Sequence, residues 1–206
     1  MIILASASPR RRELLAQLGY EFRVQAADVN EDQQPGEDPL AYVTRLAREK
    51  AQSVFSKFVI NIDTNRENSS PDKDSTLLVL GADTTVIVDG EVLGKPVDAA
   101  DAARMLRLLS GRSHSVATGV ALVSADWTDT AAEVTFVQFR ALGENEIVDY
   151  VATGDPLDKA GAYGIQGYAA RFIPRIAGCY FNVMGLPLAL AHSMIEARMI
   201  GALTRK

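Results

Sequence analysis

The sequence predicts a mixed α/β protein, and three observations support this prediction. Short apolar runs typical of buried strands, such as residues 2–5 and 77–80, alternate with longer segments whose apolar residues recur at helical spacing. Of the 206 residues, 48% are hydrophobic, which is enough to bury a substantial core. The apolar runs are all too short to cross a membrane. The pattern therefore predicts one domain, or two closely joined lobes, over residues 1–206.

The first element is a strand, a tight turn and a helix. Residues 2–5 are apolar, Ser8 is a suitable helix cap, Pro9 suits the first helical position, and Gly19 ends the helix after Leu18. Arg10 and Arg11 then occupy the first helical turn, where the positive end of the helix dipole disfavours cations. An anion such as phosphate would explain this placement, and the alternative is a solvated basic turn.

The next segments are a short strand at residues 22–26, a polar loop at 30–38 and a helix. The loop contains Glu31 and Asp32, Asp38 is the predicted cap, and Pro39 is the predicted first helical residue. A buried stripe at helical spacing follows, made of Leu40, Val43, Leu46, Ala47, Ala51 and Val54. Residues 57–75 are rich in polar residues, Asn and Ser above all towards the end, and we expect them to form a mobile surface insert.

The run at residues 77–80 is predicted to be a buried strand that ends at Gly81-Ala82-Asp83-Thr84. An acid at the end of a buried strand is costly unless it binds something, so Asp83 is a candidate site residue; the alternative is a turn-capping role. Residues 86–93 form a predicted hairpin that turns at Asp89-Gly90. Lys95 follows in Gly94-Lys95-Pro96, either near a ligand or simply solvated.

The remaining segments continue the alternation. We expect a helix capped by Asp98, strands at 114–123 and 133–141, a helix at 145–153, short strands near Phe172 and Phe181, and a terminal helix from Leu186. Three glycines fall in residues 158–167, which suggests either a backbone that approaches a ligand or a plain loop. Within that stretch, the amide of Gln166 can both donate to and accept from a base edge.

Composition excludes several classes of protein. A net charge of −5 argues against a general nucleic-acid binder or a protein that binds anionic membranes. The single cysteine cannot form an internal disulfide, and two histidines are too few for a His-rich zinc site. Because no apolar run is long enough to span a membrane and the apolar start is too short for a secretory signal, the cytoplasm is the expected compartment. Catalysis, where present, should depend on carboxylates, Lys, Arg and a metal ion.

Taken together, these stretches resemble the Maf family of nucleoside triphosphate pyrophosphatases, proteins also described as septum-formation inhibitors. The resemblance covers nearly the whole chain. The motifs that carry it are LASASPRR at residues 4–11, RLAREKA at 45–51, GADT at 81–84, GKP at 94–96, LSG at 109–111, DKAGAYGIQG at 158–167 and VMGLP at 183–187. It implies a mixed central β-sheet with flanking helices, similar to inosine triphosphate pyrophosphatases, with two lobes around a cleft and usually a homodimer.

The resemblance also implies roles for individual residues. Asp83 would activate water, Glu31 and Asp83 would hold Mg²⁺ or Mn²⁺, and Lys95 would complete the catalytic group and help to bind phosphate. The phosphates would also contact Ser8, Arg10, Arg11 and Lys50.

Arg11, Thr84 and Gln166 together look like the family branch that acts on dTTP and UTP, releasing the monophosphate and pyrophosphate. Such an enzyme would clean nucleotide pools and could take part in division arrest. Three alternatives remain: a pyrophosphatase for 7-methyl-GTP or another modified nucleotide, a non-catalytic nucleotide-binding regulator of septum formation, and a protein-interaction module.

Overall fold

The computed structural model describes residues 1–64 and 77–203, and the side chains of residues 1–60 and 77–199. Within these residues, seven strands form one mixed sheet in the order β2-β1-β3-β5-β6-β7, with β4 paired to β3. The strands are β1 Ile2–Leu4, β2 Phe22–Val24, β3 Leu78–Val88, β4 Glu91–Leu93, β5 Ser113–Val123, β6 Thr128–Gln138 and β7 Arg175–Ala177. The α-helices are α1 Pro9–Gln17, α2 Pro39–Thr64, α3 Ala99–Leu109, α4 Glu144–Ala152, α5 Tyr180–Met184 and α6 Leu188–Leu203. The predicted mixed α/β class with helices flanking a central sheet is confirmed.

The chain forms two compact units. The first contains Met1–Asp83, Gly119–Ala132 and Leu188–Lys206, and the second contains Thr84–Thr118 and Glu133–Pro187. Each unit has its own cluster of buried apolar side chains. Two units agree with the two lobes that the resemblance implies. The cleft stays a prediction.

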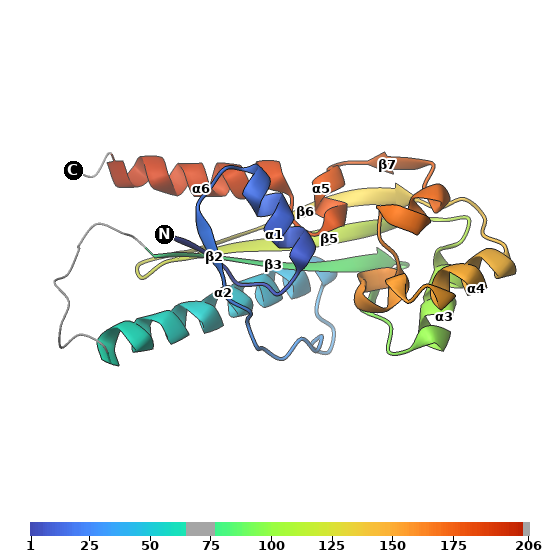
Figure 1. Ribbon diagram of the computed structural model, residues 1–206, viewed down its shortest axis with the longest axis horizontal. Coiled ribbons are helices and arrows are strands. Elements are labelled where there is room, and N and C mark those ends of the chain that lie inside the picture. The colour runs from blue at the N-terminus through green and yellow to red at the C-terminus, as the bar shows by residue number, and fades with distance from the viewer. Residues whose placement is uncertain (65–76, 204–206) are drawn as a thin grey trace. The chain divides into compact units, whose positions relative to one another are not determined.

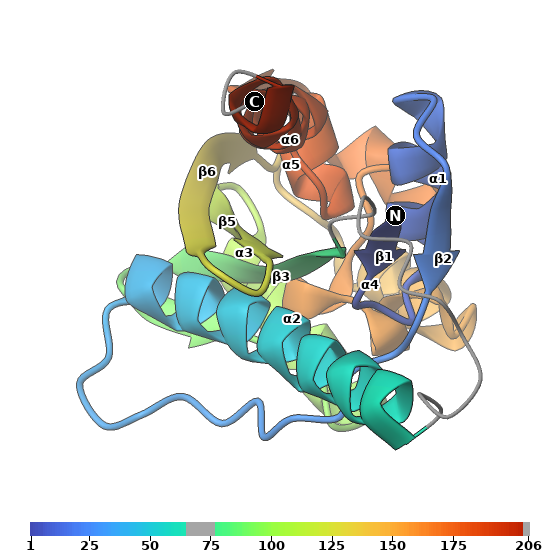
Figure 2. The ribbon, with the colours of Figure 1, turned by 90° about the vertical axis from the view of Figure 1, so that its left-hand side faces the viewer.

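In the first unit, α2 covers one face of the sheet, and α1 and α6 lie on the other (Figures 1 and 2). Strand β1 pairs in parallel with both β2 and β3. Two glycines let α2 lie directly on the strands: a Cβ at Gly81 would be 2.1 Å from the Ala47 carbonyl oxygen, and one at Gly119 would be 2.3 Å from that of Val43. Any larger residue at either position would push the helix away from the sheet.

Helix α2 is longer than the sequence predicted. Five of the six stripe residues are fully buried, whereas Leu40 at the start of the helix is 39% exposed. The helix continues to Thr64, so the prediction of a loop is wrong for residues 57–64. The reason is that the apolar stripe does not stop at Val54: Phe55 and Phe58 also pack against the core of the first unit. The rest of the predicted insert, residues 65–75, lies outside the described residues.

Strand β3 does not end before Asp83. It runs unbroken through Gly81-Ala82-Asp83-Thr84, which corrects the prediction of a strand end. The strand that ends here is β1, whose last pairs with β3 are Ile3 with Val79 and Leu4 with Leu80. Asp83 therefore lies on β3 just past the carboxyl end of its parallel neighbour, and the expectation of polar groups at a strand end applies to β1.

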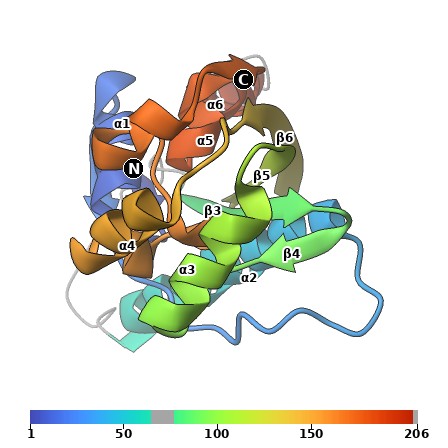
Figure 3. The same ribbon diagram turned by 90° about the vertical axis from the view of Figure 1, so that its right-hand side faces the viewer.

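In the second unit, α3 and α4 pack with the short 3₁₀ turns η1 Asp155–Asp158, η2 Ala160–Ala162 and η3 Gly167–Phe172 (Figure 3). The hairpin of β3 and β4 turns as predicted, with positive φ at Asp89 and Gly90. The short strands predicted near Phe172 and Phe181 are wrong, because Phe172 ends η3 and Phe181 lies in α5. The strand in this region is β7, which pairs with β6.

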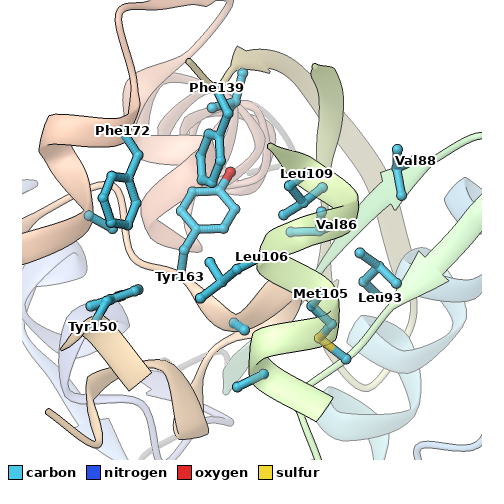
Figure 4. Packing of buried hydrophobic residues seen from close by; sticks show 14 of the residues in the cluster. Val86, Val88, Leu93, Met105, Leu106, Leu109, Phe139, Tyr150, Tyr163 and Phe172 are labelled. Carbon is cyan, nitrogen blue, oxygen red and sulfur yellow. The ribbon is translucent and has the colours of Figure 1, made fainter. Parts of the chain in front are cut away.

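The core of the second unit holds one of the two histidines. His114 Nε2 lies 2.7 Å from the hydroxyl of Tyr163, and its ring packs edge-on against Phe139. Tyr163 and Phe139 lie beside each other in a cluster with Leu106 and Phe172 (Figure 4). His114 Nδ1 has no hydrogen-bond partner among the described residues. Burial lowers the pKa of His114 from 6.5 to about 4.

This histidine should make the protein less stable in acid. Between pH 6.5 and about 4 the unfolded chain binds a proton at His114 that the folded protein does not, so stability falls as the pH falls through that window. The full effect is on the order of 3 kcal/mol. Thermal unfolding followed from pH 7.5 to 4.5 should show a smaller loss of Tm for His114→Gln than for the unchanged protein. The exposed His192 is the control, and an equal slope in His114→Gln would contradict the assignment.

Candidate active site

The turn after β1 and the start of α1 are organised around two serines. Ser8 caps α1, and its hydroxyl accepts from the backbone N–H of Arg11 at 3.4 Å. The buried Ser6 hydroxyl accepts from the N–H of Ser8 at 3.2 Å and from the Arg11 guanidinium at 3.4 Å. The predicted cap and first helical residue are confirmed, and Ser6 is an additional residue that holds the Arg11 side chain.

The centre of the candidate site is Lys50, which extends from α2 and is paired with two carboxylates. Its Nζ lies 2.6 Å from Oδ1 of Asp83 and 2.6 Å from Oε1 of Glu31. The side chains of Lys50 and Asp83 are each 10% exposed, whereas that of Glu31 is 54% exposed. The structure thus brings together Glu31, Lys50 and Asp83, three predicted site residues from separate parts of the sequence.

The charges of this group act on one another. Burial raises the pKa of Asp83, and the positive charges of Lys50 and Arg11 oppose that rise. Burial likewise lowers the pKa of Arg11, and the negative charges of Asp83 and Glu31 oppose that fall. Arg11 is therefore within electrostatic reach of both carboxylates, with Arg10 beside it as a further positive charge. The group combines a buried proton acceptor with cations suited to phosphate.

Glu31 reaches Lys50 because α2 holds its backbone. The Tyr42 hydroxyl donates to the carbonyl oxygen of Glu31 at 2.8 Å, and the Arg45 guanidinium donates to that of Asp32 at 3.0 Å. Burial raises the pKa of Tyr42 to about 12, and the negative charges of Asp83 and Glu31 add to the rise. Sequence reasoning missed Tyr42 and Arg45 as site residues. Both precede Lys50 on the same helix, and Arg45 is the first residue of the RLAREKA motif, so position and motif are the signals that could have found them.

Three predicted site residues lie in the second unit. Lys95 is exposed just after β4, and Gln166 is exposed just before η3. Thr84 lies on β3, where its hydroxyl is 2.9 Å from that of Thr118, which in turn donates to the carbonyl oxygen of Asn182. Their contacts with substrate stay predictions.

The donor set fits a hard divalent cation. Among residues 1–60 and 77–199 no group of three or more His, Cys, Asp or Glu side chains is arranged to hold a metal. Mg²⁺ in nucleotide sites, however, is usually held by one or two carboxylates together with phosphate oxygens and water. Glu31 and Asp83, which share one ammonium group as their partner, supply such a pair.

None of the helices in the described part of the chain has both the length and the apolar character needed to span a bilayer.

Comparisons with known proteins give a family model and several named relatives that match this chain. The family model described as "Maf-like protein" matches residues 1–198. Three similar relatives carry the name dTTP/UTP pyrophosphatase. That of Hahella chejuensis is 49% identical over 91% of this chain and 87% of its own length. That of Koribacter versatilis is 47% identical over 95% and 93%, and that of Symbiobacterium thermophilum is 50% identical over 91% and 88%. With a family match over almost its entire length and relatives near half identity, the chain belongs to the Maf family.

Proposed function

We propose that this protein hydrolyses dTTP and UTP to the nucleoside monophosphate and pyrophosphate. The support is twofold: several relatives at 47–50% identity are named dTTP/UTP pyrophosphatase, and the chain contains a charged group suited to phosphoanhydride hydrolysis. The single observation that carries the chemistry is the Lys50 ammonium, 2.6 Å from both Glu31 and the buried Asp83.

Each residue of the group has a step that it can perform. Asp83, as a carboxylate, accepts a proton from the attacking water. Arg11 and Arg10, with Ser8 and the positive end of the α1 dipole, bind phosphate oxygens and offset the charge that develops on them. Lys50 keeps Glu31 and Asp83 close together, and its ammonium is also available to phosphate.

Glu31 and Asp83 would hold the divalent cation. When bound, the cation would supply charge neutralisation and polarisation at the scissile phosphate. The same proposal includes Lys95 as a further phosphate contact, and Thr84 and Gln166 as contacts to the base.

Metal removal tests the role proposed for the carboxylate pair. We expect EDTA to abolish hydrolysis, because Glu31 and Asp83 add negative charge beside an already anionic triphosphate and a cation must offset it, and Mg²⁺ or Mn²⁺ in excess to restore hydrolysis. Pyrophosphate release is the measurement, and circular dichroism in EDTA is the control for folding. Full activity in chelator would show that the two carboxylates act without a metal.

Substrate ranking tests specificity. We expect dTTP and UTP to be hydrolysed well ahead of ATP, GTP and 7-methyl-GTP. Gln166→Glu should lower pyrimidine turnover, because it removes an amide donor and adds a negative charge near a polyanion. The measurement is product identification by chromatography across this panel, and Gln138→Glu, at an exposed position on β6, is the matched control.

Other outcomes of the panel separate the alternatives. Preference for 7-methyl-GTP would assign the other family branch, and equal rates on purines and pyrimidines would end the pyrimidine assignment alone. Nucleotide binding without turnover would indicate a regulator. Thermal stability unaffected by any nucleotide would favour a protein-interaction role.

We also propose that the protein acts in the cytoplasm as a homodimer, binds no nucleic acid or membrane, and cleans nucleotide pools, with an effect on division as a consequence. The support is the family resemblance and the net charge of −5. Sedimentation equilibrium would test the dimer directly.

A further inference from the structure

Three side chains of α2 contact the loop at residues 25–38, here called the Glu31 loop. Tyr42 and Arg45 bind two successive carbonyl oxygens, those of Glu31 and Asp32, at 2.8 and 3.0 Å. Lys50 binds the Glu31 carboxylate at 2.6 Å. One helix thus fixes both the backbone and the side chain of Glu31.

Arg45 is itself held in place by the end of the same loop. Its guanidinium pairs with both oxygens of Glu37, with Nε to Oε1 at 2.6 Å and Nη2 to Oε2 at 2.8 Å. The two side chains are 13% and 9% exposed. The hydrogen bond from Arg45 lowers the pKa of Glu37 to about 2, so this carboxylate stays ionised at any pH near neutrality.

Glu37 also forms hydrogen bonds with earlier residues of the loop. Its carboxylate accepts from the N–H of Gln34 at 3.1 Å, and its carbonyl oxygen accepts from the amide of Gln33 at 2.9 Å. Asp32 N–H donates to Asn30 Oδ1 at 2.8 Å. The segment from Asn30 to Glu37 is therefore one connected set of hydrogen bonds centred on Arg45.

The Glu31 carboxylate is too exposed for its ion pair alone to fix its position. Its side chain is 54% exposed, and an ion pair with one exposed partner contributes little because water and salt screen it. The ion pair with Lys50 therefore restrains Glu31 only weakly. The hydrogen bonds to the Glu31 and Asp32 carbonyls, by contrast, restrict the backbone from which the carboxylate projects.

From these contacts we infer that Tyr42 and Arg45 are positioning residues for the reaction, which hold the Glu31 loop so that the Glu31 carboxylate stays beside Lys50 and Asp83. The effects expected on kcat rest on the proposed function, whereas the effect expected on the structure of the loop does not. Tyr42 and Arg45 do not act on substrate. They act through Glu31, and the Arg45–Glu37 ion pair keeps Arg45 available to the Asp32 carbonyl.

The first test is structural and needs no substrate. Hydrogen exchange of the ligand-free protein, followed by mass spectrometry, should show amide exchange at least threefold faster in residues 30–37 of Tyr42→Phe and Arg45→Met. Tyr20→Phe and Arg198→Met are matched controls in the same unit: Tyr20 binds His192 and Glu196, and Arg198 pairs with both oxygens of Asp129. The controls should leave residues 30–37 unchanged. Unchanged exchange in both Tyr42→Phe and Arg45→Met would overturn the inference.

The second test asks whether the effect passes through Glu31. Tyr42→Phe should lower kcat about three- to tenfold, the range expected for one hydrogen bond, and raise the half-saturating Mn²⁺ concentration by a similar factor. Arg45→Met should lower kcat further, and Arg45→Lys should recover part of the loss. In a Glu31→Gln background, Tyr42→Phe should have almost no further effect. Equal effects of Tyr42→Phe in both backgrounds would show that Tyr42 only stabilises the fold.

Different results would contradict the proposed function and the positioning role. If the unchanged protein hydrolyses no nucleotide, the proposed function fails. The exchange experiment, together with Mn²⁺ binding by calorimetry in the presence of a non-hydrolysable UTP analogue, still decides whether Tyr42 and Arg45 position Glu31. Mn²⁺ binding unchanged in both variants would overturn the positioning role, and binding weakened at least threefold would support it.

Discussion

Replacement of Asp83 by asparagine is expected to reduce kcat by roughly two to four orders of magnitude, the range for loss of a general base or metal-linked acid. Asparagine has nearly the same shape, but its amide cannot accept the proton of an attacking water and is a poor substitute for a carboxylate at a cation. The side chain is 10% exposed, so bulk water does not readily take over its role. Pyrophosphate release under saturating UTP and Mg²⁺ is the measurement.

Asp126→Asn is the matched control, because Asp126 is an exposed aspartate of the same unit. It should keep full activity. Circular dichroism and thermal unfolding of Asp83→Asn should show a folded protein, so that lost turnover reports chemistry. A rate within threefold of the unchanged protein would remove Asp83 from the catalytic assignment.

Lys50→Met should reduce kcat by about two orders of magnitude and also destabilise the protein. Lys50 stands between Glu31 and Asp83, and its removal leaves two carboxylates facing each other without the shared ammonium. Like charges at short range repel, so Glu31 should move away into solvent and the pair that is proposed to hold the metal should be lost. Breaking a largely buried ion pair from one side typically costs about 3 kcal/mol, and the nearby charge of Arg11 should reduce that to about 2 kcal/mol.

Two variants make this result specific. Lys57→Met removes an exposed lysine from the same helix and should change neither rate nor Tm. Lys50→Arg keeps the positive charge and should recover part of the stability, with less recovery of rate because the guanidinium fork differs in geometry from an ammonium. A fully active Lys50→Met protein would mean that the two carboxylates need no common partner.

Local signals were enough to predict most elements of the fold. Ser8 and Pro9 mark the start of α1, Asp38 that of α2 and Asp98 that of α3, and each of these helices begins where the sequence places it. Such signals succeed because a cap satisfies N–H groups within its own turn of chain. The end of α2 could not be predicted in the same way, since the helix runs on to Thr64 past Phe55 and Phe58, whose packing against the core is a tertiary contact.

In the candidate site, too, some features could be predicted from the sequence and others could not. Arg11 and Asp83 stood out as candidates for anion and cation chemistry from their local sequence, and the family resemblance added Glu31 and Lys50. Their arrangement could not be predicted. β3 continues past its last pair with β1, Leu4 with Leu80, so that Asp83 lies within a strand, and β5 is the neighbour on its other side; these pairings are long-range contacts.

The amino-acid sequence by itself determined the fold class, the family and the identity of the charged residues, all of which depend on composition and on patterns within a few turns of chain. Only the tertiary structure decided that Lys50 pairs with both Glu31 and Asp83, and that Tyr42 and Arg45 hold the Glu31 loop. The physical reason is that these contacts join different elements: the loop before α2, α2 itself and β3. Gly81 and Gly119 let α2 lie close to the sheet, and Lys50 on that helix meets Asp83 on β3.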